Sequence, residues 1–245
     1  MMDKNIEGVG EVQTPTTVKA KAENFWYHYK WHSIVALFLV VTLVICSLQL
    51  CGRSKYDAHI LYAGSRNIGR TAADGDVAEI ATVISSLRKI TGDFDENGEI
   101  SVNFTNLYYL TAEELAALDD VNDALLTTDQ KTLSSVMSHS DYYLMFISVG
   151  VYEEYHKVGE EEMFIDLSGY ASYNADAEYY APNAILLSSI DASKLPGIAN
   201  LPDDTLVCVR QTSVMGGKSK EHTKYQENAK KILINLLKVD LPDNQ

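Results

Sequence analysis

The sequence predicts an α/β protein in which one N-terminal transmembrane helix precedes a three-layer α/β domain with a mainly parallel sheet. Residues 34–50 lie in the longest stretch of the 245-residue chain without a charged side chain. Beyond this stretch, segments with strand periodicity alternate with segments of helical periodicity, an order typical of parallel sheets covered by helices. We therefore divide the chain into a tail (1–22), a membrane segment (23–51) and a folded domain (56–240).

The membrane segment joins an aromatic belt to the apolar run. A helix needs roughly 20 residues to cross a ~30 Å hydrocarbon core, and 34–50 reaches that length with its immediate neighbours. Residues 1–22 contain few large apolar side chains and no periodicity, so we expect a disordered tail. The lipid bilayer is thus a predicted partner, and the side chains expected at its interface are Trp26, Tyr27, Tyr29, Lys30 and Trp31.

Orientation follows from the position of the apolar run near the N-terminus. A short leading segment normally stays inside, whereas long domains are translocated regardless of their charge. We therefore predict a single-pass protein of the cell membrane, with its N-terminus cytoplasmic and its C-terminal domain extracytoplasmic. An alternative is a lipoprotein in which 48–51 acts as a lipobox and Cys51 is acylated, which leaves the anchoring role unchanged.

Charge and cysteine content restrict the function of the domain. The formal net charge is -14, and residues 1–51 carry four acidic and four basic side chains, so the whole excess lies in 52–245. An acidic domain argues against nucleic acid as a partner, because phosphate neutralisation needs clustered Lys and Arg. Cys208 is the only cysteine beyond residue 51 and reads as a small core residue. The domain must therefore be held together by its apolar core.

The folded domain is predicted as a succession of strands and helices. The continuous apolar run at 142–147 indicates a strand buried on both faces, and hence central in the sheet. A capping box at 111–114 predicts a helix start. Residues 168–182 are expected to be irregular: a lid, a contact surface or a solvated excursion of the chain. The predicted strands are 56–63, 100–107, 142–147, 163–167, 184–190 and 205–211, and the predicted helices are 76–90, 111–118, 129–138, 149–158 (closed by Gly159) and 220–239.

Two resemblances can be stated on these residues. NFWYHYKWH at 24–32, the apolar run and YDAHILYAG at 56–64 resemble a group of uncharacterised single-pass membrane proteins of Gram-positive gut bacteria. That resemblance implies location and architecture. Residues 141–170 and the closing helix around 226–233 are similar to extracellular solute-binding proteins. Those proteins have two lobes flanking a cleft, and this domain has the length of one, so the resemblance implies solute binding only in part.

The candidate ligand-binding residues are Gly64, Ser65, Arg66 and Ser148. The first three begin a turn at the carboxyl end of the first strand, and Ser148 ends the central strand. Open α/β sheets bind ligands at this edge. Serine hydroxyls, backbone N–H groups and the Arg66 charge suit an anionic or hydroxyl-bearing ligand. The alternative is that the glycines serve only the geometry of the turn.

A second loop has the oxygen ligands of a calcium site. Asp93, Asp95 and Asn97 occupy the first, third and fifth positions of a calcium loop, and Gly98 the sixth. The twelfth position, where a bidentate Glu is expected, is Phe104. We therefore favour a plain Asn-Gly turn, with a Ca²⁺ site as the alternative and no other cofactor predicted.

The sequence contains no catalytic motif, and we predict no catalytic residue. Gly216-Gly217-Lys218-Ser219 has the setting of a phosphate-binding loop, but Thr212 stands where its first glycine belongs. The function that we expect is binding of a small-molecule solute. A protein-interaction module of a cell-envelope assembly is the alternative, and a surface hydrolase is a third reading.

Overall fold

The computed structural model describes residues 17–51, 56–69, 76–118, 123–139, 141–212 and 220–238. The chain separates into two compact units, Met1–Ser54 and Lys55–Gln245. The loop 216–219 that resembles a phosphate-binding loop lies outside the described residues.

The first unit contains one long helix, α1 (Val18–Cys51). Its segment Phe25–Cys46 is long and apolar enough to cross a membrane, and none of that segment is buried within the structure. The predicted membrane segment is therefore helical throughout its described length. The helix begins at Val18, so residues 18–22 differ from the disordered tail predicted there, and 1–16 lie outside the described residues.

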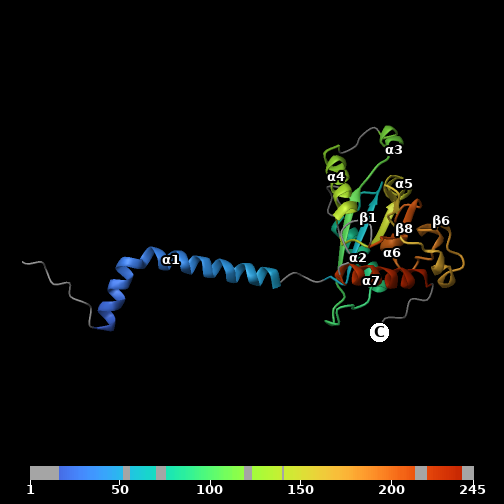
Figure 1. The fold of residues 1–245 in the computed structure, drawn as a ribbon. Helices are drawn as coiled ribbons and strands as arrows, with labels where there is room; N and C mark the ends of the chain where they lie inside the picture. Colours follow the sequence, from blue (N-terminus) through green and yellow to red (C-terminus); the bar gives the residue numbers. More distant parts are fainter. Residues whose placement is uncertain are drawn as a thin grey trace, which may run out of the picture. The chain divides into compact units, whose positions relative to one another are not determined.

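The second unit is built on one six-stranded sheet with the order β2-β1-β3-β8-β7-β6 (Figure 1). Only β1 runs parallel to its neighbours β2 and β3, whereas β3–β8, β8–β7 and β7–β6 are antiparallel. The prediction of a mainly parallel sheet is wrong: the sheet is mixed. The strands are β1 (Ala58–Gly64), β2 (Val102–Tyr108), β3 (Leu144–Ser148), β6 (Tyr179–Ala181), β7 (Ala184–Leu186) and β8 (Thr205–Val209).

The antiparallel half has a local cause. Only residues 182 and 183 separate β6 from β7, and so short a connection can join strands only as an antiparallel hairpin. β1 and β2, by contrast, are joined through a helix of 15 residues, the crossover that parallel pairing requires. Periodicity alone does not distinguish these cases, because both kinds of strand are apolar here.

Helices cover both faces of the sheet, and the alternation of side chains in β3 shows this. Leu144 and Phe146 belong to one apolar cluster with α2 and α7, whereas Met145 and Ile147 belong to another with α4 and α5. All five residues of β3 are buried, which confirms the predicted central strand. The helices are α2 (Asp76–Ile90), α3 (Ala112–Ala116), α4 (Asp123–His139), α5 (Val149–Tyr155), α6 (Pro196–Ala199) and α7 (Lys220–Leu237).

Several boundaries differ from the predictions. The helix expected at 149–158 ends at Tyr155, and Gly159 instead turns a small hairpin of β4 (Lys157–Val158) and β5 (Glu161–Glu162) with a φ of 66°. The strand expected at 163–167 is reduced to a single bridge between Phe164 and Arg210. Residues 168–182 are irregular only in part, because they contain the 3-10 helix η1 (Ser168–Tyr173) and the edge strand β6.

Other local predictions are confirmed. Thr111 caps α3 in the predicted box, accepting from the Glu114 N–H while the Glu114 side chain accepts from the Thr111 N–H. Cys208 is fully buried in the apolar core, and burial raises the pKa of its thiol. Both features follow from short-range patterns that the surrounding fold does not override.

Candidate functional site

The carboxyl ends of β1 and β3 lie side by side at the point where the chain order of the sheet reverses. β1 connects to β2 on one side and pairs with β3 on the other. A Cβ placed on Gly64 would lie 3.5 Å from the Cβ of Ser148, so these two predicted residues are neighbours. Open α/β sheets place ligands at such a switch point.

Ser148 has a structural task there. Its side chain is 3% exposed, and its Oγ accepts the N–H of Val151 at 3.4 Å, which caps α5. A hydroxyl engaged in this way closes the end of a helix and is withdrawn from solvent. Ser65 is half-buried and does not border the cavity that lies beside Arg66 at this edge.

Gly64 is required by a close approach of the Tyr62 ring. A Cβ on this glycine would stand 2.8 Å from the Tyr62 hydroxyl oxygen, which itself accepts the Arg66 N–H at 3.3 Å. Burial of the Tyr62 ring raises the pKa of its phenol. The tyrosine therefore acts as a neutral support under the turn that carries Arg66.

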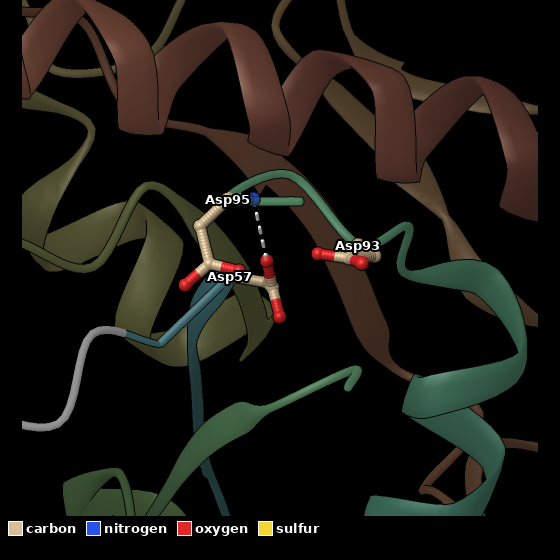
Figure 2. A group of neighbouring side chains, drawn as sticks. All are labelled: Asp57, Asp93 and Asp95. Carbon is tan, nitrogen blue, oxygen red and sulfur yellow. Dashed lines mark hydrogen bonds between the residues drawn. The ribbon is translucent and has the colours of Figure 1, made fainter. Parts of the chain in front are cut away.

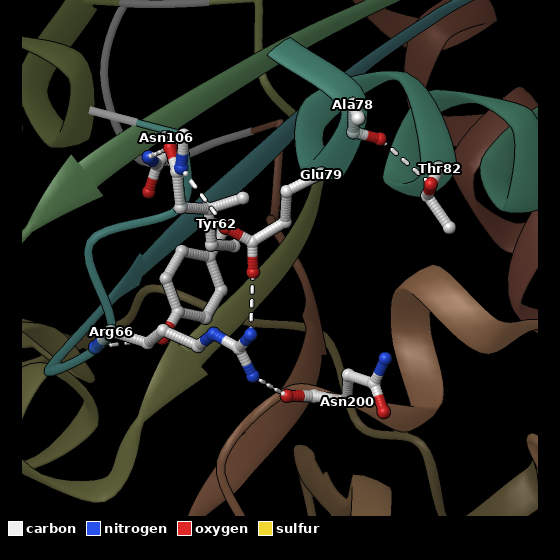
Figure 3. A network of polar contacts seen from close by, with 9 residues as sticks. Tyr62, Arg66, Ala78, Glu79, Thr82, Asn106 and Asn200 are labelled. Atoms are coloured by element: carbon white, nitrogen blue, oxygen red, sulfur yellow. Dashed lines mark hydrogen bonds and ion pairs between the residues drawn. The ribbon is translucent and has the colours of Figure 1, made fainter. Parts of the chain in front are cut away.

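Arg66 joins three parts of the domain through its guanidinium group (Figure 3). Its Nη2 lies 2.5 Å from Oε1 of Glu79 on α2, and its Nη1 donates to the backbone carbonyl of Asn200 just after α6. The other Glu79 oxygen, Oε2, accepts the N–H of Gly69 at 3.2 Å. The turn after β1 is thus tied to both α2 and the segment after α6.

These groups line a cavity of about 270 Å³ between the turn, α2 and α6. Aliphatic side chains form much of its wall, and none of the described lining residues is aromatic. α6 approaches α2 so closely that a Cβ on Gly197 would lie 2.5 Å from the Val83 Cα. The lining residues are Arg66, Ile68, Ala78, Glu79, Thr82, Val83, Gly197, Asn200 and Leu201.

Asn106 of β2 lies behind this wall and is 6% exposed. Its Nδ2 donates to the carbonyl of Ile68. The N–H of the same peptide unit, which belongs to Gly69, donates to Glu79. Its Oδ1 is buried and meets no donor, and the same holds for Oδ1 of Asn67 among the residues the structure describes. Buried acceptors without donors are uncommon in folded proteins.

An acidic group stands at the same edge of the sheet. Asp204 precedes β8, and its carbonyl accepts the N–H of Val149. Burial raises the pKa of the Asp204 carboxyl, and the negative charge of Glu114 raises it further. The carboxyl edge therefore carries polar groups that the fold leaves partly uncompensated.

The opposite, amino edge is organised by Asp57, which precedes β1 and is 1% exposed. Its Oδ1 accepts the N–H groups of Phe94 and Asp95 at 2.7 and 3.2 Å. Its Oδ2 accepts the N–H and hydroxyl of Ser101 at 2.8 and 3.2 Å. One buried carboxylate thus holds the loop between α2 and β2 in place.

The predicted calcium loop is held by the carboxylate of Asp93. Asp93 accepts the N–H groups of Asn97 and Gly98 at 3.1 and 2.8 Å, and Gly98 has a φ of 86°. Oxygens of Asp57, Asp93 and Asp95 lie within 4.8 Å of one another (Figure 2). The Nδ2 of Asn97 donates to Oδ2 of Asp95 at 2.9 Å. The Ca²⁺ site remains a prediction, with Asp57 as a carboxylate that sequence spacing did not indicate.

The predicted interface residues lie on α1, where Trp26, Tyr27, Tyr29 and Trp31 are all more than half exposed and Lys30 is exposed too. The ring of Tyr29 stacks on that of Phe25, with 5.2 Å between the centroids. Aromatic side chains without partners in the core are typical of a membrane–water boundary.

Comparison of the chain with protein-family models, with curated proteins and with solved structures found no match. The site must therefore be judged by its geometry. Of the four predicted ligand residues, only Arg66 reaches the cavity. Glu79, Asn106 and Asn200 were missed, and the one usable signal was Asn106, a polar residue on the inward face of a predicted strand.

Proposed function

We propose that the domain binds a small-molecule solute in the cavity between the turn after β1, α2 and α6. The observation that carries this proposal is the Arg66–Glu79 pair in the lining of a cavity with both polar and aliphatic walls, at the switch point of the sheet. Small-molecule sites are typically concave and mostly apolar, with a few placed polar groups that set orientation.

We further propose that α1 holds this domain at the outer face of the cell membrane, with the N-terminus inside. The exposed aromatic belt and the unburied apolar segment Phe25–Cys46 support the membrane anchor, and the orientation rests on the short segment that precedes the anchor. A membrane-impermeant protease added to intact cells should then remove the domain while sparing the N-terminal segment. Loss of the N-terminal segment alone would reverse the orientation.

Ligand binding is tested by thermal denaturation of the full chain in lipid nanodiscs against a broad metabolite panel. A solute that binds only the folded state stabilises it by RT ln(1 + [L]/Kd), about 2.7 kcal/mol at a hundredfold excess over Kd. At least one solute should raise the melting temperature and lose its effect in Arg66→Gln. A panel without any such solute would contradict the proposal.

A further inference from the structure

We infer that the solute is a zwitterion: a free α-amino acid with a small aliphatic side chain, whose carboxylate pairs with Arg66 and whose ammonium pairs with Glu79. This inference rests on the solute-binding function proposed above and names its ligand class. Arg66 and Glu79 come from different elements, the turn after β1 and α2, and face each other at the cavity (Figure 3).

The spacing of the two charges selects the ligand. The cationic nitrogen and the carboxylate oxygen lie 2.5 Å apart, so the protein presents opposite charges side by side. In an α-amino acid one carbon separates the ammonium from the carboxylate, which places its charges at a similar separation. The two dipoles can lie antiparallel, so that each protein charge meets its opposite in the ligand. A γ-amino acid or a diamine lacks this match.

The existing pair does not prevent such binding. The side chains of Arg66 and Glu79 are 42% and 33% exposed, and exposed ion pairs contribute little stability. The Arg66 guanidinium has five N–H groups and uses one on Glu79 and one on Asn200. N–H groups therefore remain for a ligand carboxylate without loss of the anchoring contacts.

Glu79 is held in position from behind. Its Oε2 accepts the N–H of Gly69, and the carbonyl of the same peptide unit accepts Nδ2 of buried Asn106. The Asn106 amide therefore holds the Ile68–Gly69 peptide in place, and that peptide holds the Glu79 carboxylate. Asn106 is thus a positioning residue for the ammonium site.

The wall explains the expected side chain. Ile68, Val83 and Leu201 are buried aliphatic residues that border the cavity, and its volume is about 270 Å³. Sugar rings normally stack on aromatic side chains, and the described residues of the lining include none. A phosphate or a simple carboxylate would be repelled by the negative charge of Glu79, because it has no ammonium group to pair with that side chain. An aliphatic amino acid satisfies both charges and the apolar wall.

The test is titration calorimetry of the full chain in nanodiscs with the twenty L-amino acids, and then with the N-acetyl and carboxamide derivatives of the tightest one. We expect an aliphatic amino acid to bind and both derivatives to bind at least about tenfold more weakly. Arg66→Gln and Glu79→Gln should each weaken the binding of the free amino acid by about tenfold or more. Glu79→Gln should not weaken the binding of the N-acetyl derivative and should if anything tighten it, because that derivative has no ammonium and its carboxylate no longer faces the Glu79 charge.

Glu227→Gln is the matched control, because Glu227 forms an exposed pair with Lys230 at 2.8 Å on α7. Its affinity should equal that of the wild type. If no amino acid binds but a sugar, nucleoside or dicarboxylate does, the zwitterion assignment is overturned and solute binding stands. If neither the amino acids nor the metabolite panel binds, both proposals fail. An affinity for the amino acid that Glu79→Gln leaves intact also overturns the assignment.

Discussion

The two polar edges of the sheet differ in how completely their hydrogen bonds are satisfied. At the amino edge, both oxygens of buried Asp57 accept donors from the loop 94–101. At the carboxyl edge, Arg66 and Glu79 are half-exposed beside a cavity, and Oδ1 of Asn106 has no donor among the described residues. The amino edge thus engages both oxygens of its buried carboxylate, and the carboxyl edge is where we propose that a solute binds.

This difference matters because buried polar groups are costly unless they are paired. Here the buried acceptor of Asn106 at the carboxyl edge has no donor among the described residues, while both carboxylate oxygens of Asp57 at the amino edge are engaged. The comparison predicts that substitutions at the amino edge change stability, and that polar substitutions at the carboxyl edge change binding.

The largest effect is expected from Asp57→Ala. It removes a buried acceptor from three partly buried backbone N–H groups, those of Phe94, Asp95 and Ser101. Each unsatisfied group costs about 1–3 kcal/mol, so we expect a loss of at least about 3 kcal/mol in urea denaturation of the full chain. Asp203→Ala is the control, because Asp203 is exposed. A loss no greater than that of the control would remove the distinction between the edges.

Gly197→Ala should have the next largest effect, through packing at the carboxyl edge. The added Cβ would lie 2.5 Å from the Val83 Cα and push α6 from α2, at a cost of about 1–3 kcal/mol. Gly169→Ala is the matched control, because a Cβ there meets nothing within 4 Å. Equal melting temperatures for the two variants would contradict the close approach of α6 to α2.

Arg66→Gln is expected to change stability by less than about 1 kcal/mol, since its pair with Glu79 is partly exposed. The contrast with Asp57→Ala sharpens the comparison: here solute affinity falls while the unfolding midpoint barely moves. A loss of stability as large as that of Asp57→Ala would make Arg66 a structural residue instead.

The smallest effects concern pH and have opposite signs at the two edges. Hydrogen bonds from Gly98 and Asn97 lower the pKa of Asp93, so its contribution is present above pH 3.8 and is lost as pH falls through the folded pKa. Burial and Glu114 raise the pKa of Asp204, so a destabilising contribution grows as pH rises above the unfolded value of 3.8 and is fully present above the raised pKa of the folded state.

At pH 7, Asp93→Asn should therefore lower the melting temperature and Asp204→Asn should raise it. The Asp204→Asn difference shrinks as pH falls to the unfolded value of 3.8, and the Asp93→Asn difference shrinks only at lower pH. Thermal melts of wild type and both variants between pH 3 and 8 check this. Shifts of the same sign at pH 7 would show that the two edges respond alike.

Short-range patterns predicted a large part of this structure. The helix α2 has the bounds that its apolar spacing indicated, Thr111 forms its capping box, and β3 is central because its side chains are apolar on both faces. Arg66 was placed at the carboxyl edge of the sheet because a strand followed by a glycine turn ends there. These features depend on neighbours within a few residues, which the sequence displays directly.

Tertiary structure decided the features that join distant residues. The direction of β8 depends on how the chain returns across the sheet. Asp57 finds Ser101, and Arg66 finds Glu79 and Asn200, only when separate elements pack together. The sequence by itself determined the apolar segment, the α/β class and many of the local starts and stops. Which polar groups were satisfied and which were left at a cavity was decided by packing, because a hydrogen bond needs its partner in space and not in order along the chain.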